Sequence, residues 1–299
     1  MSNQSYATTS RITAKTRICL TIGDPIEHSL SPTMHNAAYR ELGIDDKFVF
    51  VAARVKVEHL ADFVQAVRVM NILGVSCTLP HKLEVIKYLD WVDPIVEDIG
   101  AVNTIVNEGG VLKGYNTDWL GVVAPLEKLT SLERRKVAVI GAGGAARAAV
   151  YGLVNRGAIV KVYNRTVAKA ESLAKEFHCW AGGLEELGEI VDAEIIINTT
   201  SVGLSGTKDE SLVNPDFIKS HHICFDAVYT PYETKFLRDA KAVGATIIHG
   251  TEMLIHQGMV QFKHFTNQNA PEEVMRQAVL QALGVSEQVN DFWSEKPNC

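Results

Sequence analysis

Cysteine is scarce in this 299-residue chain, and the five cysteines are widely scattered. Their number is odd and no pair has the Cys-x-x-Cys spacing, so the sequence indicates neither a disulfide framework nor a zinc site. His221 and His222 are adjacent. In a strand they would point to opposite faces, which disfavours a metal site there too. Unpaired cysteines fit a reducing compartment, and we expect a cytoplasmic protein that binds no metal.

Long apolar runs and an excess of positive charge are also missing. No segment approaches the roughly 18 consecutive apolar residues that a membrane span requires. The net charge of −6 disfavours a nucleic-acid-binding protein, because such proteins normally carry a basic surface. We therefore expect a small-molecule partner, with neither a membrane nor a nucleic acid as partner. The sequence leaves a homodimer open.

The two ends of the chain lack strong patterns. No acidic residue precedes Asp24, and Arg11, Lys15 and Arg17 lie in a stretch rich in Ser and Thr, which weakly resembles an organelle transit peptide. A disordered tail ahead of the first strand is the simpler interpretation. Residues 285–299 are interpreted as a loose tail.

Short β-type runs alternate with helical patterns, which is typical of an α/β fold with parallel strands. In the first half, strands are predicted at residues 18–22, 48–55, 73–78 and 102–106, and the last turns through Gly109 and Gly110 into a return strand. Helices are predicted at 57–70 and 83–89. Another begins at Ser31, where we expect a serine cap followed by Pro32 and, past the end of the helix, Gly43.

The second half has the pattern of a Rossmann-type unit. A strand at 137–140 leads into a glycine turn and a helix that runs to residue 155. Further strands are predicted at 159–163, 193–198, 223–228 and 246–249. Thr251 is expected to cap a helix that contains Gln257, and a last helix is predicted at 271–283. The length of the chain suits two domains, each with its own core.

The glycine turn has the sequence of a dinucleotide-binding loop and stands between an apolar strand and an Ala-rich helix. The first glycine permits a tight turn, the second lets the backbone approach a pyrophosphate, and Ala146 allows close packing of helix against strand. Phosphate would then meet the free N–H groups at the helix N-terminus. The residues predicted to bind the cofactor here are Gly141, Ala142, Gly143, Gly144 and Ala145.

The end of the next strand indicates NADP rather than NAD. NAD enzymes usually carry an acidic residue at this place to hold the ribose 2′-hydroxyl, whereas this chain has Asn164, Arg165 and Thr166. A carboxylate would repel a 2′-phosphate, and a guanidinium with flanking amide and hydroxyl groups offers several donors to it. Lys169, four residues after Arg165, adds a second positive charge. The alternative is that Arg165 is a solvated surface residue.

Polar residues in the first half follow predicted strands, at the end of an open α/β sheet where ligands bind. Each also has a structural explanation: Ser31 can cap a helix, Asn103 can bridge a turn, and a single lysine is usually solvated. As a group of hydroxyls, amides, one ammonium and one carboxylate, they suit a small polyhydroxylated acid. The group comprises Ser29, Ser31, Thr78, Lys82, Asn103 and the run 116–118.

These motifs, taken in order, resemble the shikimate dehydrogenase family over nearly the whole stretch 18–283. Because they come from both predicted domains, the resemblance is more specific than a glycine fingerprint alone. The matching segments are Ser29-Leu-Ser-Pro32, Met34-His-Asn36, Thr78-Leu-Pro-His-Lys82, Gly100-Ala-Val-Asn-Thr104, Gly114-Tyr-Asn-Thr-Asp118, Gly141-Ala-Gly-Gly144, Asn164-Arg-Thr166 and residues 250–257.

The resemblance implies a two-domain enzyme that reduces 3-dehydroshikimate to shikimate with NADPH, a step of aromatic amino acid biosynthesis. A substrate-binding domain with a mostly parallel sheet would comprise residues 1–118 and 251–299, and an inserted Rossmann domain residues 119–250. Ser29 and Ser31 would bind the substrate carboxylate. The nicotinamide would lie near Ala227 and Gly250. The ring hydroxyls would be surrounded by Thr78, Lys82, Asn103, Asp118 and Gln257, with Thr117 and Tyr229 nearby.

Two segments depart from the family pattern. Many members have Asn-Val-Thr where this chain has Ser76-Cys77-Thr78, and residues 199–203 replace the commoner Ala-Thr-Pro-x-Gly. These changes leave the predicted catalytic residues in place and concern the packing around the nicotinamide.

Lys82 and Asp118 are the predicted catalytic residues. Reduction of a ketone requires a hydride at carbon and a proton at oxygen, with stabilisation of the developing alkoxide. The Lys82 ammonium can supply both the positive charge and the proton, and Asp118 would hold it in place. Two alternatives are considered. An NAD-dependent quinate or quinate/shikimate dehydrogenase is disfavoured by Arg165 and Ser31, and a non-catalytic NADP-sensing module is disfavoured by the Lys82/Asp118 pair.

Overall fold

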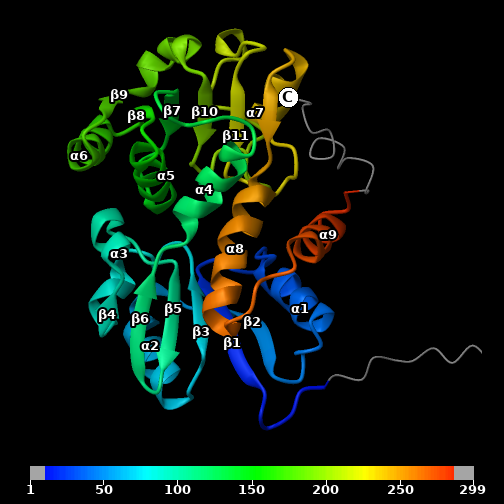
Figure 1. Cartoon of the computed structure of the whole chain (residues 1–299). Coiled ribbons are helices and arrows are strands. Elements are labelled where there is room, and N and C mark those ends of the chain that lie inside the picture. Colours follow the sequence, from blue (N-terminus) through cyan, green and yellow to red (C-terminus); the bar gives the residue numbers. More distant parts are fainter. Residues whose placement is uncertain (1–10, 286–299) are drawn as a thin grey trace, which may run out of the picture.

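The computed structural model describes residues 11–285 and contains two six-stranded sheets, one above the other in Figure 1. The first sheet has the order β2-β1-β3-β5-β6-β4. Its β1–β2, β1–β3 and β4–β6 pairs are parallel, whereas β3–β5 and β5–β6 are antiparallel. Its strands are β1 (Arg17–Gly23), β2 (Phe48–Arg54), β3 (Gly74–Cys77), β4 (Trp91–Val92), β5 (Thr104–Glu108) and β6 (Val111–Tyr115).

The second sheet is parallel throughout and has the order β12-β11-β10-β7-β8-β9. Read from β9, this is the 3-2-1-4-5-6 order of a Rossmann fold, and the strand order reverses between β7 and β10. Ligands of such sheets bind at that reversal, outside the carboxyl ends of the strands. The strands are β7 (Lys136–Ile140), β8 (Ile159–Tyr163), β9 (Trp180–Gly182), β10 (Ile195–Asn198), β11 (Ile223–Asp226) and β12 (Thr246–Ile248).

Helices cover both sheets, and two of them connect the halves of the molecule. The first half contains α1 (Ser31–Glu41), α2 (Leu60–Val69) and α3 (Pro94–Ile99), with 3-10 helices η1 (Val57–His59) and η2 (Glu84–Tyr88). The second contains α5 (Gly144–Asn155), α6 (Val167–Phe177) and α7 (Lys235–Ala242), with η3 (Leu184–Asp192) and η4 (Pro215–Phe217). The chain passes into the second sheet through α4 (Asp118–Glu127) and returns through α8 (Gly250–Thr266) to α9 (Glu272–Ala282).

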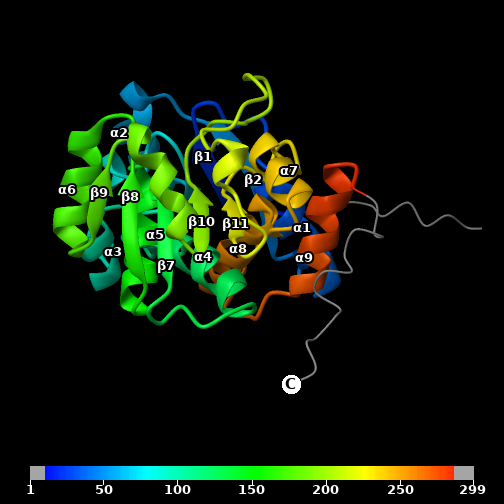
Figure 2. The same cartoon turned by 90° about the horizontal axis from the view of Figure 1, so that it is seen from above.

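The two connecting helices pack tightly against each other beside the space between the sheets (Figure 1). Gly121 of α4 permits this contact, because a Cβ there would lie 2.8 Å from the carbonyl oxygen of Met253 in α8. After α8, the chain places α9 against α1, as both views show (Figures 1 and 2). Residues 250–285 therefore pack with the first sheet and its helices, although they follow the second sheet in sequence.

Apolar side chains form the cores on both sides of each sheet. Val137, Val139 and Val162 point to one side of the second sheet and pack against α4 and α5, whereas Ala138 and Ile140 belong to the core on the other side. This near-continuous burial is expected of parallel strands covered on both faces. None of the helices over residues 11–285 is long and apolar enough to cross a membrane.

The predicted strands and the α/β architecture are confirmed, but several local predictions were wrong. Ser31 does not cap α1: it is the first helical residue, Leu30 precedes it, and no side-chain cap bond forms. Thr251 likewise lies inside α8, which begins at Gly250. His221 and His222 lie in a turn before β11, not in a strand. The helix predicted at 83–89 is a 3-10 helix, and Gly43 does end α1 with a positive φ of 62°.

Part of the predicted tails falls outside the described residues, namely 1–10 and 286–299. The stretch 11–16 is held against the loop before β2. Thr16 donates a hydrogen bond from Oγ1 to the carbonyl oxygen of Asp46 at 2.7 Å, and Arg11 pairs with Asp45 at 3.3 Å.

Candidate active site

A cavity opens between the two sheets, at the carboxyl ends of strands from both. The first half contributes the loops after β1 and β3, Asn103 before β5, and the start of α4. The second half contributes the loops after β7, β10 and β11, and α8 supplies one wall. The predicted residues that line the cavity are Ser29, Ser31, Thr78, Lys82, Asn103, Asp118, Gly143, Gly144, Ala145, Ala227, Tyr229, Gly250 and Gln257.

Lys82 and Asp118 meet in this cavity. The Lys82 Nζ atom lies 2.6 Å from Asp118 Oδ2, and the two side chains are 11% and 6% exposed. Lys82 lies in the loop after β3, where its carbonyl oxygen accepts a bond from the Val102 N–H at 2.8 Å. Asp118 is the first residue of α4, where the helix dipole favours a negative charge. The predicted catalytic pair is therefore formed by two segments that lie 36 residues apart in the sequence.

Asn103 fixes the second carboxylate oxygen of Asp118. Its Nδ2 atom donates to Asp118 Oδ1 at 2.9 Å and to Thr117 Oγ1 at 2.9 Å, and it lies 3.5 Å from Gln257 Oε1. Thr117 is 1% exposed and lies behind Asn103, outside the set of described residues that line the cavity. Asp118 thus receives one donor at each oxygen, an amide at Oδ1 and an ammonium at Oδ2.

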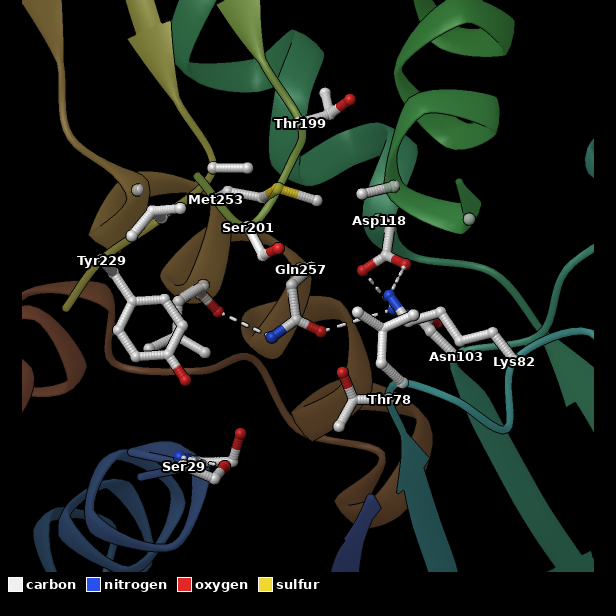
Figure 3. Close-up of a pocket in the computed structure, with 18 of the residues that line it drawn as sticks. Ser29, Thr78, Lys82, Asn103, Asp118, Thr199, Ser201, Tyr229, Met253 and Gln257 are labelled. Carbon is white, nitrogen blue, oxygen red and sulfur yellow. Dashed lines mark hydrogen bonds and ion pairs between the residues drawn. The ribbon is translucent and has the colours of Figure 1, made fainter. Parts of the chain in front are cut away.

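The other polar groups lie around the cavity at the positions that suit a small polar ligand. In Figure 3, Ser29 and Tyr229 lie on one side of the view and Lys82 and Asp118 on the other, with Thr78 and Gln257 between them. Ser29 Oγ accepts a long bond from the Ser31 N–H at 3.4 Å. Burial raises the pKa of Tyr229, so its hydroxyl stays protonated and can donate. Hydroxyls thus face an ammonium and an amide across one small space.

The glycine turn after β7 forms the opposite wall. Gly141 has φ of 120°, and a Cβ there would lie 2.5 Å from Thr199 Oγ1, so only glycine fits. A Cβ on Gly143 would have no other atom within 4 Å, so a ligand could approach the protein backbone there. No side chain caps α5. The N–H groups at the start of α5 are therefore available to an anion. A Cβ on Gly144 would lie 3.4 Å from Lys82 Cδ, so the turn reaches the catalytic pair.

The predicted 2′-phosphate residues follow β8 and are largely exposed. Asn164 Nδ2 donates to the carbonyl oxygen of Thr166 at 2.9 Å, which shapes the loop at the start of α6. Arg165 and Lys169 are exposed, and within residues 11–285 neither forms an ion pair. They lie outside the cavity wall, as does Ala142. Two unpaired cations at one strand end fit a phosphate, and this donor set suits NADP better than NAD.

Several lining residues were not predicted as site residues. Thr199, Thr200 and Ser201 follow β10, next to the reversal of strand order, and the rule for ligand sites in such sheets could have identified them. Cys77 also lines the cavity, but burial raises the pKa of its thiol to about 12, which disfavours a nucleophilic role. The other unpredicted lining residues are Thr21, Ile26, His28, Ser76, Leu79, Leu204, Val228, Met253 and Leu254.

A buried carboxyl group supports the two loops on the cofactor side. Asp226 is fully buried at the end of β11 and accepts bonds from Asn198 Nδ2, Val228 N–H and Thr234 Oγ1 at 2.9, 3.0 and 2.6 Å. Asn198 in turn accepts from the Thr200 hydroxyl at 2.7 Å. Burial raises the pKa of Asp226 to about 6, against the effect of its three donors. The carboxyl group therefore joins the 199–201 and 227–229 segments of the wall.

No metal centre is found in the part of the chain that the structure describes: nowhere over 11–285 do three or more His, Cys, Asp or Glu side chains gather to hold an ion. The available chemistry is that of an ammonium, a carboxylate, hydroxyls and amides beside a dinucleotide loop.

Three family models match this chain in sequence order. The shikimate dehydrogenase substrate binding domain matches residues 21–105, the shikimate / quinate 5-dehydrogenase model residues 125–215, and the shikimate 5'-dehydrogenase C-terminal domain residues 250–280. The shikimate dehydrogenase (NADP(+)) of Pyrococcus abyssi is 44% identical over 264 residues, which cover 88% of this chain and 97% of the relative.

Solved structures of shikimate dehydrogenases also resemble this chain. A shikimate dehydrogenase in complex with NADP+ superimposes with a TM-score of 0.87 at 38% identity, covering 91% of this chain and 97% of the other. Shikimate 5-dehydrogenase from Thermus thermophilus, in complex with NADP(H) and shikimate, has a TM-score of 0.84 at 35% identity, covering 90% and 100%. The similarity extends over both sheets and both connecting helices.

Proposed function

The chain belongs to the shikimate dehydrogenase family, and we propose that it reduces the ring ketone of 3-dehydroshikimate to shikimate with NADPH, as a step toward aromatic amino acids. The observation that carries this proposal is the 2.6 Å contact of Lys82 Nζ with Asp118 Oδ2 in a cavity whose opposite wall is a dinucleotide-binding turn. A proton donor and a hydride carrier would thus lie on either side of one small space.

The polar groups of the cavity suit the two ends of the substrate. Ser29 and Ser31 would bind its carboxylate, because hydroxyl and backbone N–H groups at the start of α1 donate to an anion. The ring oxygens would be surrounded by Thr78, Asn103 and Gln257, which present one hydroxyl and two amides. In this arrangement Tyr229 closes the side of the cavity next to Ser29.

The residues present fit NADP. The turn from Gly141 to Ala145 would hold the pyrophosphate, and Asn164, Arg165, Thr166 and Lys169 the 2′-phosphate. Ala227 and Gly250 would lie beside the nicotinamide. When bound, the reduced cofactor supplies the hydride. We also propose that residues up to 118 and from 251 onward form the substrate-binding domain, with residues 119–250 as the inserted cofactor domain.

Side chains of the protein would donate and accept the proton. The Lys82 ammonium would donate a hydrogen bond to the ketone oxygen, stabilise the negative charge that develops there, and transfer its proton as the carbon is reduced. Asp118 orients the ammonium through Oδ2, and Asn103 holds Asp118 in position by donating to its Oδ1. In the reverse direction the neutral amine of Lys82 would accept the hydroxyl proton. Because both side chains are nearly buried, water competes little for these bonds.

A steady-state absorbance assay tests the proposal. Purified protein with shikimate and NADP+ should generate NADPH, whereas quinate and NAD+ should each give a much lower kcat/KM. Ser31 leaves less room for the additional ring hydroxyl of quinate than glycine would, and Arg165 favours the 2′-phosphate. Comparable activity with quinate and NAD+ would instead identify a quinate dehydrogenase, and NADP binding without turnover of either acid would identify a cofactor-sensing module.

A further inference from the structure

Two buried side chains beside the catalytic pair make no contact with the cavity, yet they are joined to it by hydrogen bonds. Gln261, in α8, and Thr104, the first residue of β5, are both fully buried. Gln261 Nε2 donates to Thr104 Oγ1 at 3.0 Å, and Thr104 Oγ1 donates to Asn103 Oδ1 at 2.8 Å. We propose that Thr104 and Gln261 are positioning residues, which fix the Asn103 amide and through it the Lys82/Asp118 pair.

The orientation of the Asn103 amide follows from an obligate donor. The Thr117 backbone N–H lies 2.8 Å from one of the two terminal amide atoms of Asn103, which must therefore be the oxygen. This Oδ1 atom has two lone pairs, and the second receives the Thr104 hydroxyl. Nδ2 is then directed to Asp118 Oδ1 at 2.9 Å. A hydroxyl at position 104 thus helps to set which side of the amide faces the catalytic carboxylate.

The orientation of Gln261 follows from an obligate acceptor. Its Nε2 atom lies 3.2 Å from the backbone carbonyl oxygen of Asn103, which cannot donate. The same nitrogen lies 3.0 Å from Thr104 Oγ1 and 3.2 Å from Ser76 Oγ. Because Gln261 donates to the Thr104 hydroxyl, that hydroxyl must turn its own proton elsewhere, and Asn103 Oδ1 is the acceptor in reach. The direction of the hydrogen-bond chain is thereby fixed from α8 to Asp118.

The chain of hydrogen bonds links substrate binding to proton transfer through one helix. Gln257, which lines the cavity, lies one turn before Gln261 in α8. Both amides approach Asn103, Gln257 Oε1 at 3.5 Å from Nδ2 and Gln261 at the backbone. A displacement of α8 would therefore move a substrate contact and the support of Asp118 together. Because Thr104 and Asn103 are buried, loss of the Thr104 hydroxyl would leave the Asn103 amide oxygen short of one donor, which is costly in a buried site.

The test rests on the proposed function and uses the intact chain in the NADP-linked shikimate assay. Thr104→Val keeps the shape of the side chain and removes its hydroxyl. We expect kcat to fall about tenfold, a misplacement effect rather than the loss of a catalytic group. The KM for NADP should stay within about twofold, and the primary isotope effect on kcat should rise, because hydride transfer becomes slower. Thr104→Ser, which restores the hydroxyl, should recover most of the activity.

A double-mutant cycle separates positioning from general loosening of the core. In an Asn103→Ala background there is no amide left to orient, so Thr104→Val should then change kcat by less than about twofold. Gln261→Met removes the donor at the other end with little change in volume and should reproduce the loss of kcat. Full kcat in both soluble single variants, or additive losses in the Asn103→Ala background, would overturn the proposal. Absence of shikimate oxidation by the unmodified protein would instead overturn the proposed function.

Discussion

We expect the free energy of unfolding to depend on pH through the buried side chain of Asp226. The side chain is fully buried, and burial raises its pKa from 3.8 to about 6. A carboxyl group with a raised pKa in the folded state is held preferentially in its protonated form. Its contribution to the free energy of unfolding is therefore complete below pH 3.8 and is lost as the pH rises through about 6. Each pKa unit corresponds to about 1.4 kcal/mol, so the total loss amounts to about 3 kcal/mol.

Asp226→Asn should remove this pH dependence while keeping the local bonds. The amide oxygen can accept from Asn198 Nδ2 and the Val228 N–H, and the amide nitrogen can donate to the Thr234 hydroxyl. The variant should therefore gain stability relative to the unmodified protein as the pH rises. About half of the 3 kcal/mol difference falls between pH values of about 5 and 7.5, a range in which the unfolded carboxyl group is already ionised.

The measurement is urea unfolding of both proteins at a series of pH values, with the difference in unfolding free energy plotted against pH. All other titrating groups cancel in this difference. Thr234→Val provides a matched comparison in the opposite sense, because the loss of a donor should raise the pKa of Asp226 further and extend the pH dependence to higher pH. A difference curve between the unmodified protein and Asp226→Asn that is flat from pH 5 to 7.5 would refute the assigned ionisation.

Three further predictions concern the catalytic pair, the cofactor loop and the support of α8. Lys82→Ala should lower kcat by about a hundredfold or more while shikimate still binds, as kinetics and equilibrium titration can show, and near-normal turnover would exclude its role. Arg165→Asp with Asn164→Gly should raise the KM for NADP far more than that for NAD, and an unchanged preference would contradict the charge argument. Arg276→Met removes the cation that pairs with the buried Glu252 carboxylate and should lower the free energy of unfolding in urea by about 3–5 kcal/mol. Glu252→Gln in the same chain should restore most of this loss.

The strands were predictable because buried parallel strands appear as short apolar runs, and β8 begins and ends at the predicted residues. Helix α4 was missed for a related reason. It is almost entirely apolar and contains Pro125, so it shows little of the periodic contrast that identifies a surface helix. It is buried between α5 and α8, a property of the assembled fold. The capping predictions failed at Ser31 and Thr251 because side-chain type alone does not fix the first helical residue.

The cavity residues were largely predictable from motifs, but their mutual geometry was not. Lys82 follows β3 and Asp118 follows β6, and the pairing of both strands with β5 brings the two residues together. The hydroxyls of 199–201 lie in a segment that departs from the family pattern and were not predicted as site residues, although their place after β10 follows from strand order. Thr104 and Gln261 could not be recognised in the sequence, because a buried hydroxyl or amide acquires a direction only from its partners.

The positions of the cofactor loop and of the proposed proton donor Lys82 depend on each other. The aliphatic part of the Lys82 side chain lies beside the glycine turn, since a Cβ on Gly144 would lie 3.4 Å from Lys82 Cδ. The Lys82 ammonium is held by Asp118. Lys82 therefore lies next to the start of α5, whose free N–H groups are available at the predicted pyrophosphate position. Any relative movement of the two sheets would change the distance between the proposed hydride carrier and the proposed proton donor, because each is assigned to a different sheet. The hydrogen bonds that run from α8 through Asn103 to Asp118 lie within the half that contains the first sheet, so they would fix the proposed proton donor relative to that sheet.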